Sequence, residues 1–513
     1  MARDSRVKKT AFQMIYGRTI IVMILLVLQI AMLFYLITLA GKVAAFVMSG
    51  LSFVLLIVVI NRKGQPSFKM TWVLLLAITP VFGGLFYLFI QTQPGTKQIK
   101  EKLAELEKDT RPYMQQDQAV MQNLLSENPQ MAQLSHYLCD RGGYPMYQNT
   151  SVKYLSTGEI YFEELVNQLK KAEKFIFMEY FIVDQGKMWD TVLEVLKEKA
   201  AQGVEVRVMY DGMCSLMRLP YRYPEQVREM GIQCKMFAPI MPLLSTSQNN
   251  RDHRKIVVID GVTAFTGGVN LADEYINEKM RFGHWKDTGI MLQGDAVQNF
   301  TMMFLTMWNV DEPQPPTFRP YLTPHILGDE AAGYVVPYAD SPLEDENVGE
   351  HVYLDILYTS KRYVHIMTPY LIIGHELLQA LTYAAKRGVE VELILPHIPD
   401  KWYAFQVART YYRELLEEGV KIYEYTPGFI HAKSYVSDDE KAVVGSINMD
   451  FRSLYLHYEC AALFFNNPAV ADVEKDFQET KAKSQMMTIE DYNQLPLRGR
   501  IAGQILRLIA PLM

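Results

Sequence analysis

Apolar residues are concentrated in three uncharged runs near the start of the chain. These runs are Thr19–Ala40, Val43–Ile60 and Thr71–Ile90. Each approaches the roughly 17–25 residues that a helix needs to cross a bilayer, and no comparable run follows. The pattern predicts an N-terminal anchor over residues 1–95 with about three transmembrane helices. Two alternatives stay open: a cleaved signal peptide for the first run, and a re-entrant segment for the third, which Pro80 interrupts.

Basic residues near these runs give an expected orientation. Five lysines and arginines precede the first run, and the loop at residues 61–70 carries three more. Because positively charged loops tend to stay in the cytoplasm, three spans would place the remaining chain at the outer face. Two spans would reverse that side. Residues 96–135 are polar and charged, and they predict a solvated linker helix.

The rest of the chain contains an internal repeat of strand, helix and strand. The first copy has a dense apolar strand at 175–182, a helix at 189–202 that Gly203 ends, and a strand at 204–209. The second copy places the same elements at 364–371, 376–387 and 389–395. This order predicts parallel βαβ units with helices on the sheet faces. We therefore expect an α/β body with two pseudo-twofold-related halves, at 136–325 and 326–513.

Each half continues into the same motif, H-x-K-x4-D-x6-G-(G/S)-x-N. The first copy contains His253, Lys255, Asp260, Gly268 and Asn270. The second contains, at identical spacing, the residues His431, Lys433, Asp438, Ser446 and Asn448. Two copies at matching points of a repeat make chance a poor explanation.

The spacing within the motif predicts a shared site. A histidine and a lysine two positions apart on a strand point to the same face. A two-residue turn at Asp260-Gly261 would place Gly268 opposite His253, and the repeat would place Ser446 beside His431. Two imidazoles, two ammonium groups and two amides would then meet where the halves join.

This set of residue types suits phosphodiester chemistry. Lysines bind phosphate as point charges, one imidazole can attack phosphorus, and a second can protonate the leaving oxygen. No carboxylate cluster suited to Mg²⁺ is evident, so we expect no metal and no cofactor. The net charge of -6 argues against nucleic acid as a partner. Four scattered cysteines exclude a disulfide framework.

The paired motifs resemble those of the phospholipase D superfamily. The neighbouring strings 250–255, 268–275, 368–370, 425–433 and 448–453, together with the apolar anchor, look like bacterial cardiolipin synthases. The sequence departs from that family in its extra first apolar run and in His457, where the family more often has asparagine.

The resemblance implies transfer of a phosphatidyl group between two phosphatidylglycerol molecules through a phosphatidyl-histidine. The catalytic set is the two motifs' His253, Lys255, Asp260, His431, Lys433 and Asp438, with both aspartates expected to be structural at the hairpin ends. His253 is expected to be the nucleophile and His431 the general acid and then base. The residues expected to hold phosphate are Asn270, Asn448, Gly268 and Ser446.

The same resemblance assigns Asp287 and Glu459 to orienting the histidines. It also implies a multi-pass protein of the bacterial cell membrane, with membrane lipid as partner and with a homo-oligomer as an option. The other buried histidines, His457 among them, are expected to be structural.

Three further questions stay open. A hydrolytic phospholipase D would share the motifs, and a non-enzymatic scaffold would be expected to lack one of them. The apolar C-terminal segment at 497–512, with its three arginines, fits either an interfacial helix or a helix packed on the body.

Overall fold

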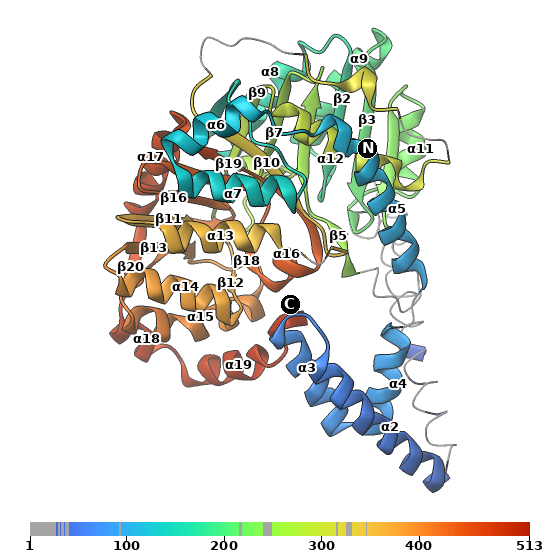
Figure 1. The fold of residues 1–513 in the computed structure, drawn as a ribbon, viewed down its shortest axis with the longest axis vertical. Coiled ribbons are helices and arrows are strands. Elements are labelled where there is room, and N and C mark those ends of the chain that lie inside the picture. Colours follow the sequence, from blue (N-terminus) through green and yellow to red (C-terminus); the bar gives the residue numbers. More distant parts are fainter. Residues whose placement is uncertain are drawn as a thin grey trace, which may run out of the picture.

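The computed structural model describes residues 41–513 apart from 92–93, 215–217, 240–248, 314–316, 325–330, 345 and 513, and before them only residues 27, 28, 31 and 35. Its body is built from two related sheets (Figure 1). The first follows the order β1-β9-β7-β6-β2-β3-β4. Its strands are β1 (Thr150–Leu155), β2 (Phe175–Tyr180), β3 (Glu205–Asp211), β4 (Gln233–Phe237), β6 (Lys255–Ile259), β7 (Thr263–Gly267) and β9 (Gly289–Gly294).

The second sheet repeats this order as β10-β19-β17-β16-β11-β13-β14, with β20 added at the edge. Its strands are β10 (Tyr334–Asp340), β11 (Tyr363–Met367), β13 (Glu390–Pro396), β14 (Lys421–Tyr425), β16 (Ser434–Ser437), β17 (Lys441–Gly445), β19 (His457–Phe465) and β20 (Ser484–Met487). In each half three strands run parallel and the motif strand joins them antiparallel. The expected duplicated α/β body is confirmed.

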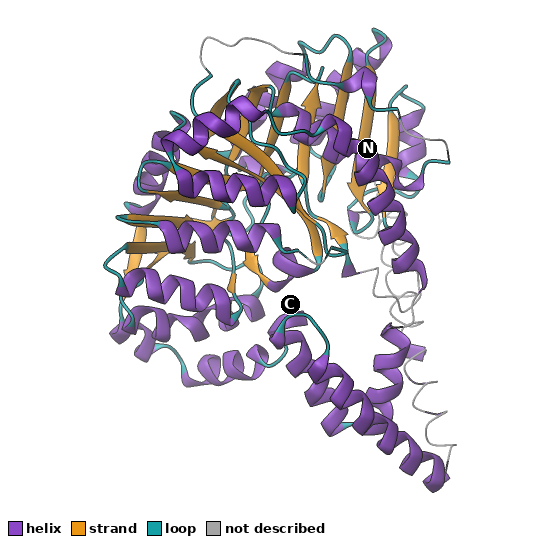
Figure 2. Cartoon of the chain, in the orientation of Figure 1, coloured by secondary structure: helices purple, strands orange, loops and turns teal. Residues whose placement is uncertain are grey.

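Helices cover the outer faces of both sheets, and the strands lie between them (Figure 2). On the first half these are α8 (Gly158–Leu169), α9 (Lys187–Ala201) and α11 (Tyr223–Arg228). On the second they are α13 (Val348–Thr359), α14 (His375–Lys386) and α15 (Trp402–Glu417). The inner faces share one apolar core, which joins Phe177 and Val258 of the first sheet to Val436 and Ala462 of the second. Helices α12 (Val297–Trp308) and α17 (Ala469–Lys481) complete this core.

Short strands next to the motifs pair with strands of the opposite half. Strand β5 (Arg251–Asp252) pairs in parallel with β19 of the second half. Strand β15 (Gly428–Ile430) pairs in parallel with β8 (His284–Lys286) of the first half. A further pair, β12 (Leu371–Ile372) with β18 (Met449–Asp450), precedes α16 (Phe451–Tyr455). Each motif is thus attached to the opposite half.

The expectation of transmembrane helices at the N-terminus is wrong for the described residues. The second run lies in α2 (Gly41–Asn61), and the third is divided into α3 (Pro66–Ile78) and α4 (Pro80–Gln91), because Pro80 lacks the N–H that would extend α3. Among the described residues, no helix is both long and apolar enough to cross a membrane. The multi-pass topology is therefore unsupported for this part of the chain. The first run lies almost wholly outside the described residues.

The charged segment at 96–135 also differs from expectation. It forms three helices, α5 (Pro94–Thr110), α6 (Gln118–Glu127) and α7 (Pro129–Asp140). The side chains of Asp117 and Asn128 cap the second and third of these helices and so divide the segment. Leu106 and Leu124 are fully buried, so the segment packs on the body instead of standing in solvent. The chain ends with α18 (Ile489–Gln494) and α19 (Leu497–Arg507).

Candidate functional site

The two motif histidines directly follow the short strands that pair with the opposite half. His253 follows β5, and its backbone N–H donates to the Tyr458 carbonyl at 2.9 Å. His431 follows β15, and its backbone N–H donates to the Lys286 carbonyl at 2.6 Å. Both histidines are about nine-tenths buried. Each imidazole is therefore held by backbone from the opposite half.

Each histidine also takes its carboxylate from the opposite half. His253 Nδ1 lies 2.8 Å from Glu459 Oε1, and His431 Nδ1 lies 2.6 Å from Asp287 Oδ2. Both carboxylates are fully buried. Because each carboxylate occupies Nδ1, it leaves Nε2 as the nitrogen available to a substrate phosphorus or oxygen. This exchange makes one site out of two motifs.

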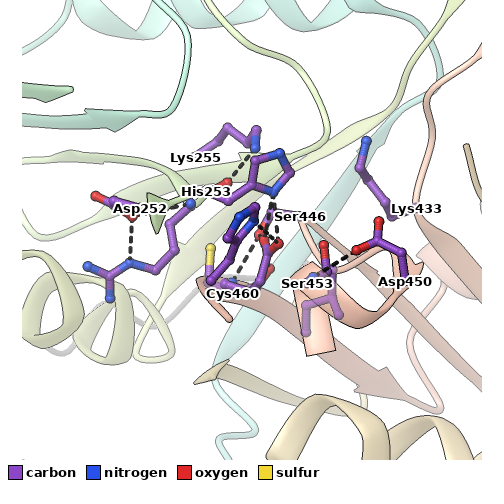
Figure 3. Close-up of polar contacts among 12 residues, drawn as sticks. Asp252, His253, Lys255, Lys433, Ser446, Asp450, Ser453 and Cys460 are labelled. Atoms are coloured by element: carbon purple, nitrogen blue, oxygen red, sulfur yellow. Dashed lines mark hydrogen bonds and ion pairs between the residues drawn. The ribbon is translucent and has the colours of Figure 1, made fainter. Parts of the chain in front are cut away.

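The motif lysines lie beside the histidines and are almost completely buried. Lys255 Nζ donates to the His253 carbonyl, and Lys433 Nζ donates to the His431 carbonyl while lying 2.8 Å from His431 Nδ1. Figure 3 shows Lys433 facing His253 and Lys255 from the other half. Two buried ammonium groups in one site form a strong binding place for a phosphate anion.

Burial sets the protonation of these groups. It lowers the pKa of His253 well below its usual value and the pKa of His431 to about 4, and the neighbouring lysines add to both shifts. Burial also lowers the pKa of Lys255 to about 8 and of Lys433 to about 7. It raises the pKa of Glu459 to about 8. His253 is therefore unprotonated at neutral pH, which is the form in which an imidazole can act as a nucleophile.

Gly268 and Ser446 lie beside the opposite histidines from those expected. The loop at 260–262 has three residues, so Val257 pairs with Phe265, which shifts the expected register by one position. A Cβ on Gly268 would lie 2.0 Å from Asp287 Oδ1, next to His431. Ser446 Oγ instead donates to Glu459, the partner of His253. Both small residues thus border the carboxylates.

The two motif asparagines are placed differently. Asn270 accepts from the Ile182 N–H at 2.9 Å and donates to the Tyr275 hydroxyl at 2.8 Å. Asn448 Oδ1 is buried without a hydrogen-bond partner among the described residues. A role for both amides in holding phosphate stays a prediction.

Asp260 and Asp438 lie at the far ends of their strands from the histidines. Each has a left-handed backbone, with φ of 55° and 59°. Asp260 accepts hydrogen bonds from the backbone N–H groups of residues 173–175, and Asp438 from those of 361–363. They tie the motif hairpin to the start of the neighbouring strand, and a purely structural role for both aspartates stays a prediction.

Aromatic and imidazole rings missed by the sequence reasoning surround both histidines. The rings of Phe181 and His457 lie 4.8 and 5.6 Å from that of His253, measured between centroids. Those of Trp285 and Tyr275 lie 5.3 and 5.5 Å from His431. Two signals in the sequence could have identified these rings. Phe181 lies near the end of the predicted strand at 175–182, and Trp285 lies two positions before Asp287.

His457 is the unexpected member of the site. Both of its ring nitrogens are buried and have no hydrogen-bond partner among the described residues, and Nδ1 lies 3.9 Å from Glu459 Oε1. Burial lowers its pKa well below the usual value. Its two unpartnered nitrogens lie beside His253, and the structural role expected of His457 stays a prediction.

Two clusters among the described residues contain metal-binding residue types. One comprises His253, His457 and Glu459, and the other His365, Glu390 and Glu392. In the first, a histidine and a carboxylate already bond to each other, and in the second both glutamates pair with Lys421.

A duplicated α/β body whose halves each supply a histidine and a lysine to one site defines a phosphodiester-transferring protein of the phospholipase D type. Residues 165–308 and 353–481 match the family described as cardiolipin synthase, PLD-like domain. Residues 50–91 match the phospholipase D-nuclease N-terminal family. The chain belongs to the cardiolipin synthase family of phosphatidyltransferases.

Relatives in other bacteria agree with this assignment. A cardiolipin synthase of Geobacillus kaustophilus is 34% identical over 88% of this chain and 90% of its own length. Cardiolipin synthase 2 of Bacillus anthracis is 33% identical over 89% of each. An uncharacterized protein of Streptococcus mutans is 46% identical over 88% of this chain and 98% of its own.

A solved structure supports the fold independently. The phosphatidylserine synthase of Haemophilus influenzae matches with a TM-score of 0.57 and 15% identity, over 75% of this chain and all of that one. Family membership implies a membrane-associated bacterial protein that acts on phospholipid.

Proposed function

We propose that the chain makes cardiolipin and glycerol from two phosphatidylglycerol molecules by double displacement at the paired motifs. The observation that carries this proposal is the exchange of carboxylates, Glu459 to His253 and Asp287 to His431. It supplies two supported imidazoles to a site whose cations come from two buried lysines. Such a site can form and then resolve a covalent phosphate intermediate.

In the first step, His253 Nε2 attacks phosphorus and the bond to the glycerol oxygen breaks. His431, protonated on Nε2, gives its proton to that oxygen, and glycerol leaves. Burial and the nearby Lys433 lower the pKa of His431 to about 4. A phosphate anion bound between the lysines opposes both effects and favours the protonated imidazole that this step needs.

In the second step, the neutral His431 takes the proton from the terminal hydroxyl of a second phosphatidylglycerol. That oxygen attacks phosphorus, and the bond to His253 breaks. Lys255 and Lys433 hold the phosphoryl oxygens in both steps, and we assign Asn270 and Asn448 the same task. Glu459 and Asp287 stabilise the charge that develops on each ring.

The proposal is tested by incubating the purified full chain with phosphatidylglycerol in the presence of EDTA and identifying the products by mass spectrometry. Cardiolipin with an equal amount of glycerol supports it. Phosphatidic acid without cardiolipin would instead show a hydrolase, and absence of turnover would contradict the proposed donor.

The roles of the two histidines are tested by trapping the intermediate with labelled lipid. His253→Ala should form no covalent adduct, whereas His431→Ala should form one slowly because its nucleophile is intact. An adduct on His431 would reverse the assignment.

A further inference from the structure

The outer side of α19 is an apolar stripe that no other part of the described chain covers. The helix packs on α15 through Gly503, where a Cβ would lie 2.5 Å from the Gln406 carbonyl oxygen. Its opposite side carries four large apolar residues at helical spacing. These are Leu497, Ile501, Ile505 and Leu508, exposed by 67, 52, 62 and 61%. The C-terminal segment is therefore both packed on the body and open on its outer face.

Trp402 extends this stripe. It shares one face of α15 with Gln406 and Thr410, since they are spaced by four residues. Helix α19 covers those two positions through Gly499 and Gly503 and leaves Trp402 58% exposed. We call Trp402, the α19 residues Leu497, Ile501 and Ile505, and the following residue Leu508 the docking face.

Positive charge accompanies the docking face. Helix α19 contains Arg498, Arg500 and Arg507 and no acidic residue. Arg500 and Arg507 rest on the rings of Tyr492 and Tyr411, while Arg498 is exposed. Lys401 is half-exposed beside Trp402. An apolar stripe with arginines and a tryptophan matches the composition of interfacial helices on anionic lipid.

Packed side chains link Lys401, next to the docking face, to the catalytic site. Lys401 Nζ donates to the Tyr370 hydroxyl at 3.0 Å. The Tyr370 ring lies 6.5 Å from Phe429, and Phe429 lies 5.8 Å from His431, measured between centroids.

We propose that the docking face binds the surface of an anionic phospholipid membrane and delivers lipid to the site. The proposal rests on the proposed function, which makes anionic lipid the substrate. A second copy of the chain would fit less well, because a twofold contact would bring the same arginines together, whereas phosphate head groups complement them.

The test uses the full chain and two forms of phosphatidylglycerol. One is presented in phosphatidylcholine vesicles, and the other is a short-chain lipid below its micelle concentration. The variant Ile501→Gln/Ile505→Gln/Leu508→Gln removes the stripe without touching the site. The matched control is Leu125→Gln/Ile160→Gln, which changes two exposed apolar residues on α6 and α8.

On vesicles, the triple variant should need about tenfold or more lipid for half-maximal rate, because three apolar contacts are lost. Its rate on short-chain lipid should equal that of the unchanged chain, as should both rates of the control. Arg498→Gln should raise the lipid concentration that gives half-maximal rate about fivefold, and only on vesicles containing phosphatidylglycerol. Hydrogen exchange in residues 497–507 should slow on adding those vesicles.

Equal loss on both lipids, or no loss on vesicles, would overturn the proposal. So would a dimer in light scattering that the triple variant converts to a monomer, because the occupant would then be a second copy. Failure of the proposed function has a different signature, since the unchanged chain would then make no cardiolipin from either lipid.

Discussion

Gly268 offers the sharpest test of the exchanged carboxylates. A Cβ at this position would lie 2.0 Å from Asp287 Oδ1 and 2.9 Å from the His431 carbonyl oxygen. The backbone of Gly268 is outside the left-handed region, so alanine can adopt its backbone conformation. The cost of the substitution comes from the close contacts of the added methyl group. The change Gly268→Ala therefore acts on the pair of Asp287 and His431.

The size of the effect follows from this geometry. To restore a separation of 3.0 Å from the new methyl group, the Asp287 carboxylate must move by about 1 Å. That movement breaks the 2.6 Å contact with His431 Nδ1. A hydrogen bond to a charged group contributes about 1.5–3 kcal/mol, so kcat should fall about 10- to 150-fold.

The assay is the steady-state rate of cardiolipin formation, with Gly50→Ala as control because a Cβ there meets no atom within 4 Å. Gly268→Ala combined with Asp287→Asn should be no slower than Asp287→Asn alone, because both changes remove one interaction. Wild-type kcat in Gly268→Ala, or losses that multiply in the double variant, would refute the reasoning.

Three other outcomes are expected. The pKa of Lys433 is about 7 and that of Lys255 is about 8, and only the ammonium form of each lysine binds phosphate. We therefore expect kcat/KM to fall as the pH rises from about 7 to about 8. A kcat/KM that stays constant to high pH would contradict the role of the two lysines in binding phosphate. His457→Asn removes a neighbour that lowers the pKa of His253, so the acidic limb of kcat/KM should move to higher pH, whereas an unmoved limb would mean that His457 does not act on His253. Asp438→Asn weakens three backbone hydrogen bonds and should lower the free energy of unfolding by about 2–4 kcal/mol in urea titration, with kcat of the folded protein unchanged.

Local patterns along the chain were enough to predict the repeated core. The predicted strands at 175–182 and 204–209 correspond to β2 and β3, because a dense apolar run is typical of a buried strand and alternating apolar residues are typical of a partly buried one. The predicted strand at 364–371 ends early, at Met367, because Pro369 cannot join the ladder. Two copies of one motif also predicted that both histidines would share a site.

Contacts between distant residues could not be predicted in the same way. The register of the first hairpin depends on whether Val262 belongs to the loop. Lengthening the loop by this one residue shifts the strand pairing, so that Gly268 lies beside His431 instead of His253. The positions of Ser446 and His457 depend on strand pairing between the halves, which has no local signal. Apolar length alone also misjudged the third run, because Pro80 divides it into two helices that are each too short to cross a membrane.

The exchanged carboxylates set a time at which the site can form during synthesis. His253 leaves the ribosome 206 residues before Glu459, and Asp287 leaves 144 residues before His431. A nascent chain that has completed its first sheet therefore contains His253 without Glu459, and Asp287 without His431. His253 gains its carboxylate only when β19 is added, so the site is complete only after most of the chain has been synthesised.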